Sequence, residues 1–522
     1  MKTKKILYFL LLLGFLSGCD YLDIVPDNLP TLEMAFNNKS SAERFLFTCY
    51  SFVPEHGKIG TDPGMDVGDE VWYYSDNSAD YSNKTTFWIA KGMQNSNEPL
   101  VDYWNGTQWG KAMFVGIRDC NVFIENIDKV PDLSAYDKET WKAEVKVLKA
   151  FYHFWLMRMY GPIPIMKENI PVSADENEVR VVRDKIDDIV AYTVSLIDES
   201  VDYLPLNIQN EAAEMGRITR PAAKAIKAKI LAFAASPFFN GNLDYANFKN
   251  ADGEPFFNQV YDGEKWTKAA EACLDAIQCA EEAGHGLYEF VNMSSTKLSE
   301  ETVLSLTNRC KVTERWNKEL VWGCGQSGIR DLQVLCQPWL ESNYSSDDRY
   351  HNARNGTFAP TLAVAETFYT KNGVPMDEDR SYDYDNRYTT QVATEADKYY
   401  IQPGYTTAKL HFDREPRFYA TLGFDGSSWY GIGKMDDNDM WYLQAKAKQA
   451  SGKRGNTLYS ITGYFAKKLV RYQNAMVPAS IQIETYPFPI IRLADLYLLY
   501  AEALNEAKKD EGTVPEDCYT YI

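Results

Sequence analysis

The stretch that decides the fold is DKETWKAEVKVLKAFYHFWLMRMY at residues 137–160, followed by GPIP at 161–164. Large apolar and aromatic side chains recur in it at the spacing of one helical face. They are Leu148, Phe151, Tyr152, Trp155 and Met159. Glycine and proline then end the helix, because glycine favours a helix C-terminus and proline cannot continue a helix. We therefore predict one long amphipathic helix that is buried along its aromatic face.

The same helical spacing of apolar residues recurs along the chain. They predict helices at residues 40–53, 100–127, 184–204, 221–235, 264–283 and 489–508. Ser40 and Glu43 form a capping-box pattern in the first of these, and Thr219 with Pro221 opens the fourth as an N-cap and a first-turn proline. Because the helices come in successive pairs, we predict a protein that is all-α in the main, with a tetratricopeptide-like helical-repeat scaffold.

Two stretches differ from this pattern. Residues 54–99 and 285–480 are rich in glycine, aspartate and tyrosine, with short strand-like runs such as 319–322. We predict an irregular, loop-rich part that lies on the scaffold. Trp104 and Trp109 fall in the helical period of 100–127 and are expected in the core.

The first residues form an export signal. Lys2, Lys4 and Lys5 supply a positive start, and residues 6–16 form an apolar run that is too short to span a membrane as a helix. The run ends in LSGC at 16–19, which resembles the bacterial lipobox, where lipid is attached to the cysteine. We predict a lipoprotein signal peptide at 1–18 and a lipid anchor on Cys19. The alternative is an ordinary signal with a cysteine nearby.

Composition excludes several classes of protein. Of the 522 residues, 45% are hydrophobic and 24% are charged, which is the balance of a globular protein and not of a disordered one. The formal net charge of -19 leaves no positive surplus for binding a nucleic-acid backbone. The cysteines after Cys19 show no zinc or redox spacing, so most of them are expected to be buried free thiols.

No catalytic or metal-binding pattern stands out. The histidines form no metal-binding pair, and His153 is expected to be a satisfied core side chain. GCGQSG at 323–328 matches a dinucleotide-binding fingerprint in its letters, but without a βαβ unit it is expected to be a glycine-rich turn. The aspartates at 377, 379 and 383 begin a calcium-loop pattern that tyrosines then break. We therefore predict no catalytic residue, no metal and no cofactor.

Aromatic side chains gather in two irregular segments. Residues 70–88 interleave tryptophan and tyrosine with aspartate and asparagine, and residues 339–350 add arginine. Such rings can stack on the C–H face of a sugar while polar groups bind its hydroxyls. The alternative is that each ring closes its own loop onto the scaffold. The candidate ligand-binding residues are Trp72, Tyr74, Tyr81, Trp88, Trp339, Tyr344 and Arg349.

Further motifs run from Cys19 to the end of the chain. They are CDYLD at 19–23, VLKAFYHF at 147–154 with YGPIP at 160–164, the segment 219–242 with AASPFFNG at 234–241, REPRF at 414–418, GYFAKK at 463–468 and FPIIRLADLYLLYAEALNE at 488–506. Together they resemble the SusD/RagB family, surface nutrient-binding lipoproteins of Bacteroidetes. Lys149 departs from the family pattern, which usually has arginine there.

The last of these motifs is the most specific, and it also makes a structural prediction. Ile491, Ala494, Leu498 and Ala501 fall on one helical stripe, which is expected to be buried. Leu496, Leu499 and Ala503 broaden that stripe. Arg492 and Asp495 stand three residues apart and are placed to form an ion pair.

The resemblance implies a SusD-like fold and capture of an oligosaccharide or polysaccharide nutrient at the outer-membrane surface, without catalysis. The partner that it implies is a SusC-like TonB-dependent transporter, on which the lipoprotein acts as a lid. Peptide capture on the same scaffold and a surface glycoside hydrolase are the alternatives. After the signal peptide we expect an N-terminal region of helix pairs at 19–240 and a C-terminal region at 241–522. Because family members usually continue past the last motif, this C-terminal region is expected to be truncated.

Overall fold

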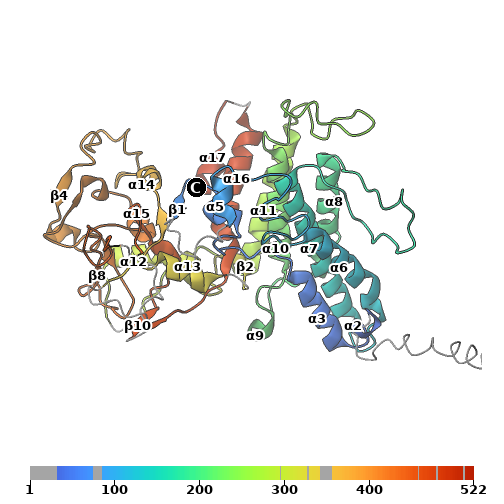
Figure 1. Ribbon diagram of the computed structural model, residues 1–522, viewed down its shortest axis with the longest axis horizontal. Helices are drawn as coiled ribbons and strands as arrows, with labels where there is room; N and C mark the ends of the chain where they lie inside the picture. Colours follow the sequence, from blue (N-terminus) through green and yellow to red (C-terminus); the bar gives the residue numbers. More distant parts are fainter. Residues whose placement is uncertain are drawn as a thin grey trace, which may run out of the picture.

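Long helices fill one half of the molecule, and irregular chain with short helices and strands fills the other (Figure 1). The computed structural model describes residues 32–73, 85–293, 296–325, 328–340, 355–455, 458–477, 480–509 and 512–522. The predicted signal peptide and Cys19 lie outside these ranges. The prediction of a mainly α-helical fold is confirmed.

The elements are short except in the helical half. The α-helices are α2 (Leu32–Ala35), α3 (Lys39–Tyr50), α4 (Pro63–Asp66), α5 (Thr85–Ala90), α6 (Met113–Asn126), α7 (Ala135–Tyr160), α8 (Ile186–Asp198), α9 (Glu211–Glu214), α10 (Arg220–Ala235), α11 (Glu264–Glu282), α12 (Glu300–Thr313), α13 (Ile329–Cys336), α14 (Leu362–Thr367), α15 (Pro416–Thr421), α16 (Leu493–Ala507) and α17 (Glu516–Thr520). The strands are β1 (Val71–Tyr73), β2 (Leu320–Cys324), β3 (Phe358–Pro360), β4 (Thr390–Val392), β5 (Thr406–Ala408), β6 (Leu422–Gly423), β7 (Ser428–Trp429), β8 (Trp441–Tyr442), β9 (Phe465–Ala466), β10 (Ala475–Val477), β11 (Ser480–Gln482) and β12 (Phe488–Arg492). The strands form two-stranded antiparallel sheets: β1 with β3, β2 with β12, β4 with β5, β6 with β9, β7 with β8 and β10 with β11.

The two best-marked helices begin and end as their sequence predicts. At the start of α7 the hydroxyl of Ser134 accepts the backbone N–H of Asp137 at 3.0 Å. The helix ends at Gly161, whose φ of 69° lies in the left-handed region. At the start of α10 the Thr219 side chain accepts a backbone N–H, and Pro221 occupies the first turn. The predicted helices at 137–160 and 221–235 are therefore confirmed.

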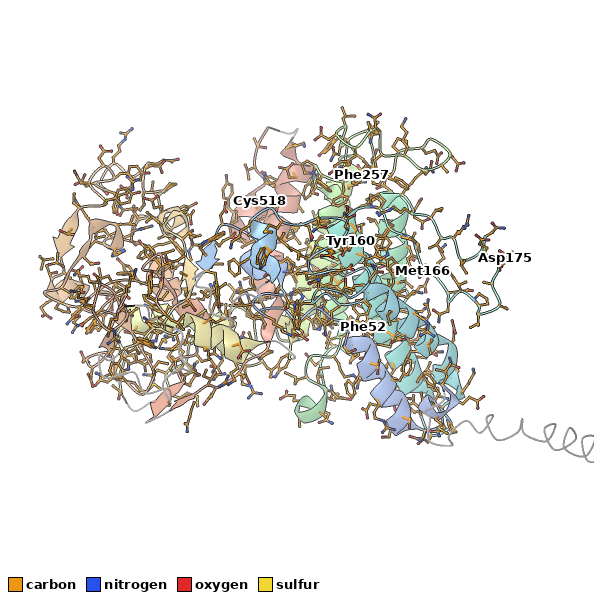
Figure 2. The ribbon with its side chains drawn as sticks, in the orientation of Figure 1. Phe52, Tyr160, Met166, Asp175, Phe257 and Cys518 are labelled. Carbon is orange, nitrogen blue, oxygen red and sulfur yellow. The ribbon has the colours of Figure 1, made fainter. Side chains whose placement is uncertain are left out.

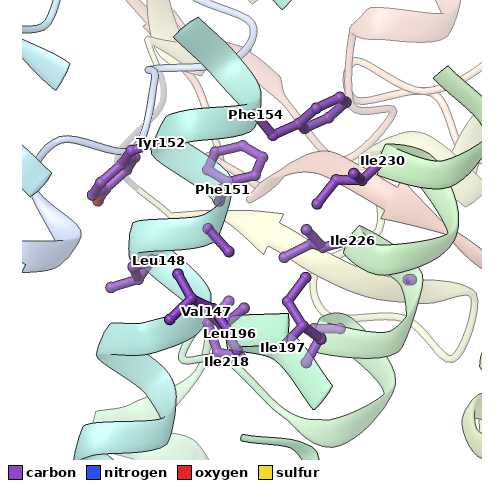
Figure 3. Packing of buried hydrophobic residues seen from close by; sticks show 14 of the residues in the cluster. Val147, Leu148, Phe151, Tyr152, Phe154, Leu196, Ile197, Ile218, Ile226 and Ile230 are labelled. Carbon is purple, nitrogen blue, oxygen red and sulfur yellow. The ribbon is translucent and has the colours of Figure 1, made fainter. Parts of the chain in front are cut away.

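Neighbouring helices pack side by side and enclose the main core. α7 packs against α6 and α8, α10 packs against α8 and α11, and α11 packs against α16. Figure 3 shows Phe151 and Phe154 of α7 in this core, with Ile226 and Ile230 of α10 facing them, and Leu148 on the opposite side of α7. Each such side chain contributes about 1.5–3 kcal/mol when fully buried. In Figure 2, Asp175 marks a loop that extends outward from the helices.

The irregular half has hydrophobic clusters of its own, and one strand pair joins it to the helices. Phe358, Trp429 and Phe465 are almost fully buried in one of these clusters. β2 and β12 pair beside the helices, and β12 runs directly into α16. Because Trp322 of β2 lies in the main core, this pair ties the two halves together.

Four predictions about helices need correction. Residues 101–112 are loop, and the helix begins at Met113, because Val101, Gln108 and Trp109 all adopt positive φ values. Residues 488–492 form β12, and the helix starts only at Leu493. α12 lies in a region that was predicted to be irregular. The N-cap of α3 is Asn38, which accepts the N–H of Ser41, so the predicted capping box at Ser40 is wrong.

The predicted stripe and ion pair of α16 are also partly wrong. The buried side chains of the helix are Leu493, Leu496, Tyr500, Ala501 and Ala503, whereas Leu498 is 56% exposed. The buried face is therefore rotated from the predicted one, and α11 covers it. Arg492 and Asp495 do not pair with each other. Arg492 binds Glu319 at 2.5 Å, and Asp495 binds Lys229 at 2.5 Å.

The described cysteines are all buried and unbridged, which confirms the prediction of buried thiols. Cys518, labelled in Figure 2, packs beneath α16 and donates its thiol hydrogen to the Ala501 carbonyl at 3.4 Å. Among the described residues, none of the helices is both long enough and apolar enough to cross a membrane.

Candidate ligand-binding site

One strand pair links the early aromatic segment to the chain that follows the central one. β1 lies within residues 70–88 and pairs with β3, which begins at Phe358 after the central segment has ended at residue 350, and Trp72 lies opposite Ala359. Beyond the pair, Thr361 donates its N–H to the Glu70 carbonyl at 3.0 Å and its hydroxyl to the Asp69 carbonyl at 2.8 Å. Figure 1 shows β1 and α5 between the two halves of the molecule. The early segment thus lies beside the chain that follows the central segment.

The structure describes only part of the predicted set. Tyr74, Tyr81, Tyr344 and Arg349 lie outside the described residues. Tyr74 and Tyr81 follow β1 in the sequence, and Tyr344 and Arg349 precede β3. The geometry of Trp72, Trp88 and Trp339 is given below.

Trp72 is half-buried and belongs partly to the scaffold. Its strand neighbours Val71 and Tyr73 are buried in the cluster of the irregular half, and Trp72 packs against the same cluster while staying partly exposed. The Trp72 ring meets the Phe87 ring edge to face, with centroids 5.9 Å apart. Edge-to-face contacts of this kind stabilise a fold by about 0.5–1.5 kcal/mol beyond area burial. Only part of this indole is therefore open to a ligand.

Trp88 presents its ring to solvent from a firm support. It lies in α5 beside the buried residues Thr86 and Phe87, and its own side chain is 41% exposed. The Lys91 ammonium lies 5.7 Å from the ring centroid, within the range of a cation–π contact. An exposed indole on a short anchored helix suits stacking against an apolar ligand face.

Trp339 is half-buried and its backbone is held at both ends. Its N–H donates to the side-chain oxygen of Asn355 at 2.9 Å, and its carbonyl accepts the Ser451 hydroxyl at 2.5 Å. Asn355 is fully buried and also donates to the Ser451 carbonyl at 3.2 Å. The guanidinium of Arg454 lies 5.2 Å from the Trp339 ring centroid. The Trp339 backbone is therefore held in place, and the ring lies next to a positively charged side chain.

Sequence reasoning missed an exposed tryptophan. Trp109 is 63% exposed and has a φ of 70°, so the expectation that it lies in the core is wrong. It lines a shallow groove with Tyr103, Lys58 and Lys111. The glycines at 106 and 110 were the signal for a loop at this point. Trp104, in contrast, packs against the rings of α6 and α7 as expected.

Two family models match most of the chain. Residues 331–522 match the model described as the SusD family, and residues 20–231 match a SusD-like model described as starch-binding and associating with the outer membrane. The chain belongs to the SusD/RagB family.

Relatives of known sequence or structure agree with the SusD/RagB assignment. A protein named SusD-like protein P25, from Formosa agariphila, is 22% identical over 240 residues, which cover 44% of this chain and 43% of that protein. The chain thus matches less than half the length of this curated relative. The solved structure of a protein named BT4246 is 26% identical with a TM-score of 0.73, covering 92% of this chain and 82% of that one. A SusD-like protein from Bacteroides fragilis, 17% identical with a TM-score of 0.63 over 93% and 78% of the two chains, shares the fold.

The recognised SusD/RagB motifs have structural roles. The buried guanidinium of Arg414, in REPRF, donates to backbone carbonyls of Leu410 and Ala365 at 2.9 and 2.8 Å. The ammonium of Lys467, in GYFAKK, is buried and donates to the carbonyls of Tyr419 and Ser428, both at 2.8 Å. Burial lowers the pKa of Lys467 well below its usual value. These motifs identify the SusD/RagB fold, and they lie apart from the aromatic segments in the sequence.

His153 is a satisfied core side chain, as predicted. It is fully buried, its Nδ1 donates to the Lys149 carbonyl at 2.8 Å, and its Nε2 accepts the Met166 N–H at 3.2 Å. Burial lowers the pKa of His153 to about 4, so the imidazole is neutral at neutral pH. Lys149, which replaces the usual SusD/RagB arginine, donates to the Lys167 carbonyl at 2.7 Å.

The acidic loops use their oxygens internally. Asp379 accepts hydrogen bonds from Thr370, Ser381 and Asn372 at 2.5 to 3.0 Å, and these hold the pKa of its carboxyl far below the usual range. Asp383 pairs with Lys409. Within the described ranges, no group of three or more histidine, cysteine, aspartate or glutamate side chains is placed to hold a metal ion. The glycines at 323 and 325 belong to β2 and the turn after it, and among the described strands β2 pairs with β12 alone, in a two-stranded antiparallel sheet.

Proposed function

We propose that the protein captures an oligosaccharide or polysaccharide nutrient at the bacterial cell surface and passes it on chemically unchanged. The observation that carries the proposal is the match of residues 20–231 to a model described as starch-binding and associating with the outer membrane. In the proposal Cys19 carries the lipid anchor, and the receiving partner is a SusC-like TonB-dependent transporter.

The candidate site supports this function through its chemistry. Trp72, Trp88 and Trp339 come from the two aromatic segments, and each presents part of an indole ring. Flat apolar rings beside polar and cationic groups suit sugars, whose rings have a C–H face and a fringe of hydroxyls. The proposed binding set remains the predicted one, with Tyr74, Tyr81, Tyr344 and Arg349 added from the same segments.

A binding and turnover screen tests the proposal. Purified protein that starts at Asp20 is titrated with starch, laminarin, xylan, mannan and pectin by calorimetry, and each mixture is then analysed for released sugars. We expect at least one glycan to bind and none to be cleaved. Release of reducing ends would support a hydrolase, and binding of casein-derived peptides without any glycan would support peptide capture. Either result overturns the proposal.

The proposed transporter needs a separate test. The full-length protein with an affinity tag at its C-terminus is purified from detergent-solubilised outer membranes of cells grown on the bound glycan. We expect a TonB-dependent barrel protein to co-purify in stoichiometric amount. Recovery of the tagged protein without any barrel protein, in several mild detergents, would contradict the partnership and leave the glycan proposal standing.

A further inference from the structure

A cavity of about 440 Å³ lies between the helical half and β2. Three segments that are distant in the sequence form its walls, namely residues 206–219 before α10, 283–285 after α11 and 316–323 around β2. Its volume is within the ~300–1,000 Å³ range of small-molecule sites. Of the candidate ligand-binding residues that the structure describes, Trp72, Trp88 and Trp339, none lines it.

Trp316 forms one wall and is held in an unusual conformation. It is half-buried, and its φ of 46° is left-handed, which a bulky residue adopts only where its surroundings fix it. Two glycines make room for its ring. A Cβ atom on Gly323 would lie 3.2 Å from the Trp316 ring, and one on Gly216 would lie 3.4 Å from it. Trp322 fixes this arrangement, because its indole N–H donates to the Gly216 carbonyl at 3.1 Å.

Polar groups that are free to bind surround this aromatic wall. The Nδ1 of His285 donates to the Lys318 carbonyl at 3.0 Å, and burial lowers the His285 pKa, so the neutral ring offers its Nε2 as an acceptor. The side chains of Asn207, Glu211 and Lys318 also line the cavity. In the part of the chain that the structure describes, none of these three has a hydrogen-bonding or ion-pair partner. Asn207 supplies an amide, Glu211 a hydrogen-bond acceptor and Lys318 a hydrogen-bond donor.

The charges at the cavity balance. Arg217 lines it, but its guanidinium is bound by the buried Glu144 at 2.6 Å and by Glu214 at 2.6 Å, so it is not free to bind an anion. The remaining pair, Glu211 and Lys318, carries opposite charges. The pocket thus has a tryptophan wall, several hydrogen-bonding groups without partners and no net charge among its unpaired groups. Such a lining favours a neutral polyhydroxylated ligand over an anion or a cation.

We propose that this cavity is a second saccharide-binding site, in which Trp316 stacks on a ring of a short neutral oligosaccharide. The site is independent of the β1–β3 site and deepens the proposed function, on which it rests. His285, Asn207, Glu211 and Lys318 bind the hydroxyls of the sugar. A chain of sugars held at the aromatic segments thus has a second point of attachment on the same molecule.

The test uses ¹⁹F NMR of the protein labelled with 5-fluorotryptophan at its 12 tryptophans. Substitutions W316F, W88F and W339F assign three resonances, and W109F assigns an exposed tryptophan outside both sites. Maltoheptaose, laminarihexaose, xylohexaose and mannohexaose are titrated in turn. We expect at least one of them to shift the Trp316 resonance in a saturable manner while the Trp109 resonance stays in place.

The outcomes separate this inference from the proposed function. If the Trp88 or Trp339 resonance shifts and Trp316 does not, the second site is wrong and the proposed function stands. If only Trp316 shifts, the cavity site holds and the aromatic-segment site is wrong. If no resonance shifts with any of the four sugars, both are overturned.

A matched variant measures the contribution of the ring. Trp316→Asn is preferred to alanine, because asparagine tolerates the left-handed backbone. We expect it to weaken binding of the sugar that shifts Trp316 by about 5-fold or more, as for other aromatic stacking platforms. Trp109→Asn serves as the control and should leave affinity unchanged. Equal affinities for the wild type and Trp316→Asn, in proteins with the same thermal midpoint, would contradict the stacking role.

Discussion

Trp88→Ala should lower glycan affinity and weaken the fold less than Trp72→Ala does. A tryptophan side chain offers up to about 250 Å² of surface, and the side chain of Trp88 is 41% exposed. A sugar that covers one face, about half of that exposed area, removes roughly 50 Å² from water. At about 25 cal/mol per Å² this contributes ~1.3 kcal/mol, which corresponds to about a 10-fold change in Kd.

The same substitution should lower stability by less than the loss of a fully buried tryptophan. Alanine removes the cation–π contact with Lys91, worth about 0.5–1 kcal/mol at an exposed site, and the packing of the covered part of the indole. Alanine also has the better helix propensity in α5, which offsets part of that loss. Trp72→Ala is the matched comparison, because Trp72 packs edge to face on Phe87 and is half-buried. It should lower the thermal midpoint as well as affinity.

Calorimetric titration with the glycan from the binding screen, and thermal unfolding of the same samples, provide the two readouts. The reasoning predicts an affinity loss with a smaller fall in thermal midpoint for Trp88→Ala than for Trp72→Ala. An unchanged affinity for Trp88→Ala would remove Trp88 from the proposed site. A fall in its midpoint as large as that of Trp72→Ala would show that the ring is structural.

Three further predictions concern the anchor, a buried ion pair and a buried imidazole. Cys19→Ala should release the protein from the membrane fraction and abolish labelling with radioactive palmitate; continued membrane association of the variant in cells that lack the transporter would contradict the anchor. Arg217→Ala leaves the Glu144 carboxylate buried without its cation and should lower the unfolding free energy by about 3–5 kcal/mol in denaturant titrations. The double substitution of Arg217→Met with Glu144→Gln should lower it by less. Equal losses for the two proteins would refute the pairing argument. The pKa of His153 is lowered from 6.5 to about 4, so the unfolded state takes up the proton first and stability is lost as pH falls from about 6.5 to about 4. His153→Gln should remove up to about 3 kcal/mol of this pH dependence, and parallel stability–pH curves for the two proteins would contradict it.

Local signals in the sequence predicted the ends of helices correctly where contacts within one helical turn determine them. The hydroxyl of Ser134, the glycine at 161, and the Thr219 and Pro221 pair set the ends of α7 and α10, because caps act within one helical turn. The aromatic face of α7 was readable because its partners, α6 and α8, cover the stripe that the period marks.

The failures have a different physical origin. β12 was predicted as the start of a helix because its partner β2 lies far away in the sequence, and no local period reveals such a pairing. For the same reason Arg492 was assigned to Asp495, although the buried Glu319 carboxylate is its partner. Trp109 was assigned to the core because it falls within a helical period of the sequence. Its positive φ breaks the helix there, and φ is not visible in the sequence.

The candidate site was only partly predictable. Composition marked both aromatic segments, but not that β1 in the first segment pairs with β3, which follows the second. The cavity beside Trp316 carries no sequence signal at all, because its walls come from three segments that only the fold brings together. The glycine at 323 was noticed as part of a nucleotide-like pattern, and its role in the structure is to leave room for an indole ring.

The pairing of β1 with β3 also sets the order in which the binding surface can form. Asp69 and Thr361 are in contact although they stand 292 positions apart. At a synthesis rate of about 5–20 residues per second, β1 waits ~15–60 s for its partner strand to be made. Pairings of such long range close large loops and are slow to form. The binding surface is therefore a late product of folding, and a fragment that ends before β3 contains the helices up to α13 but neither α16, which covers α11, nor an assembled site.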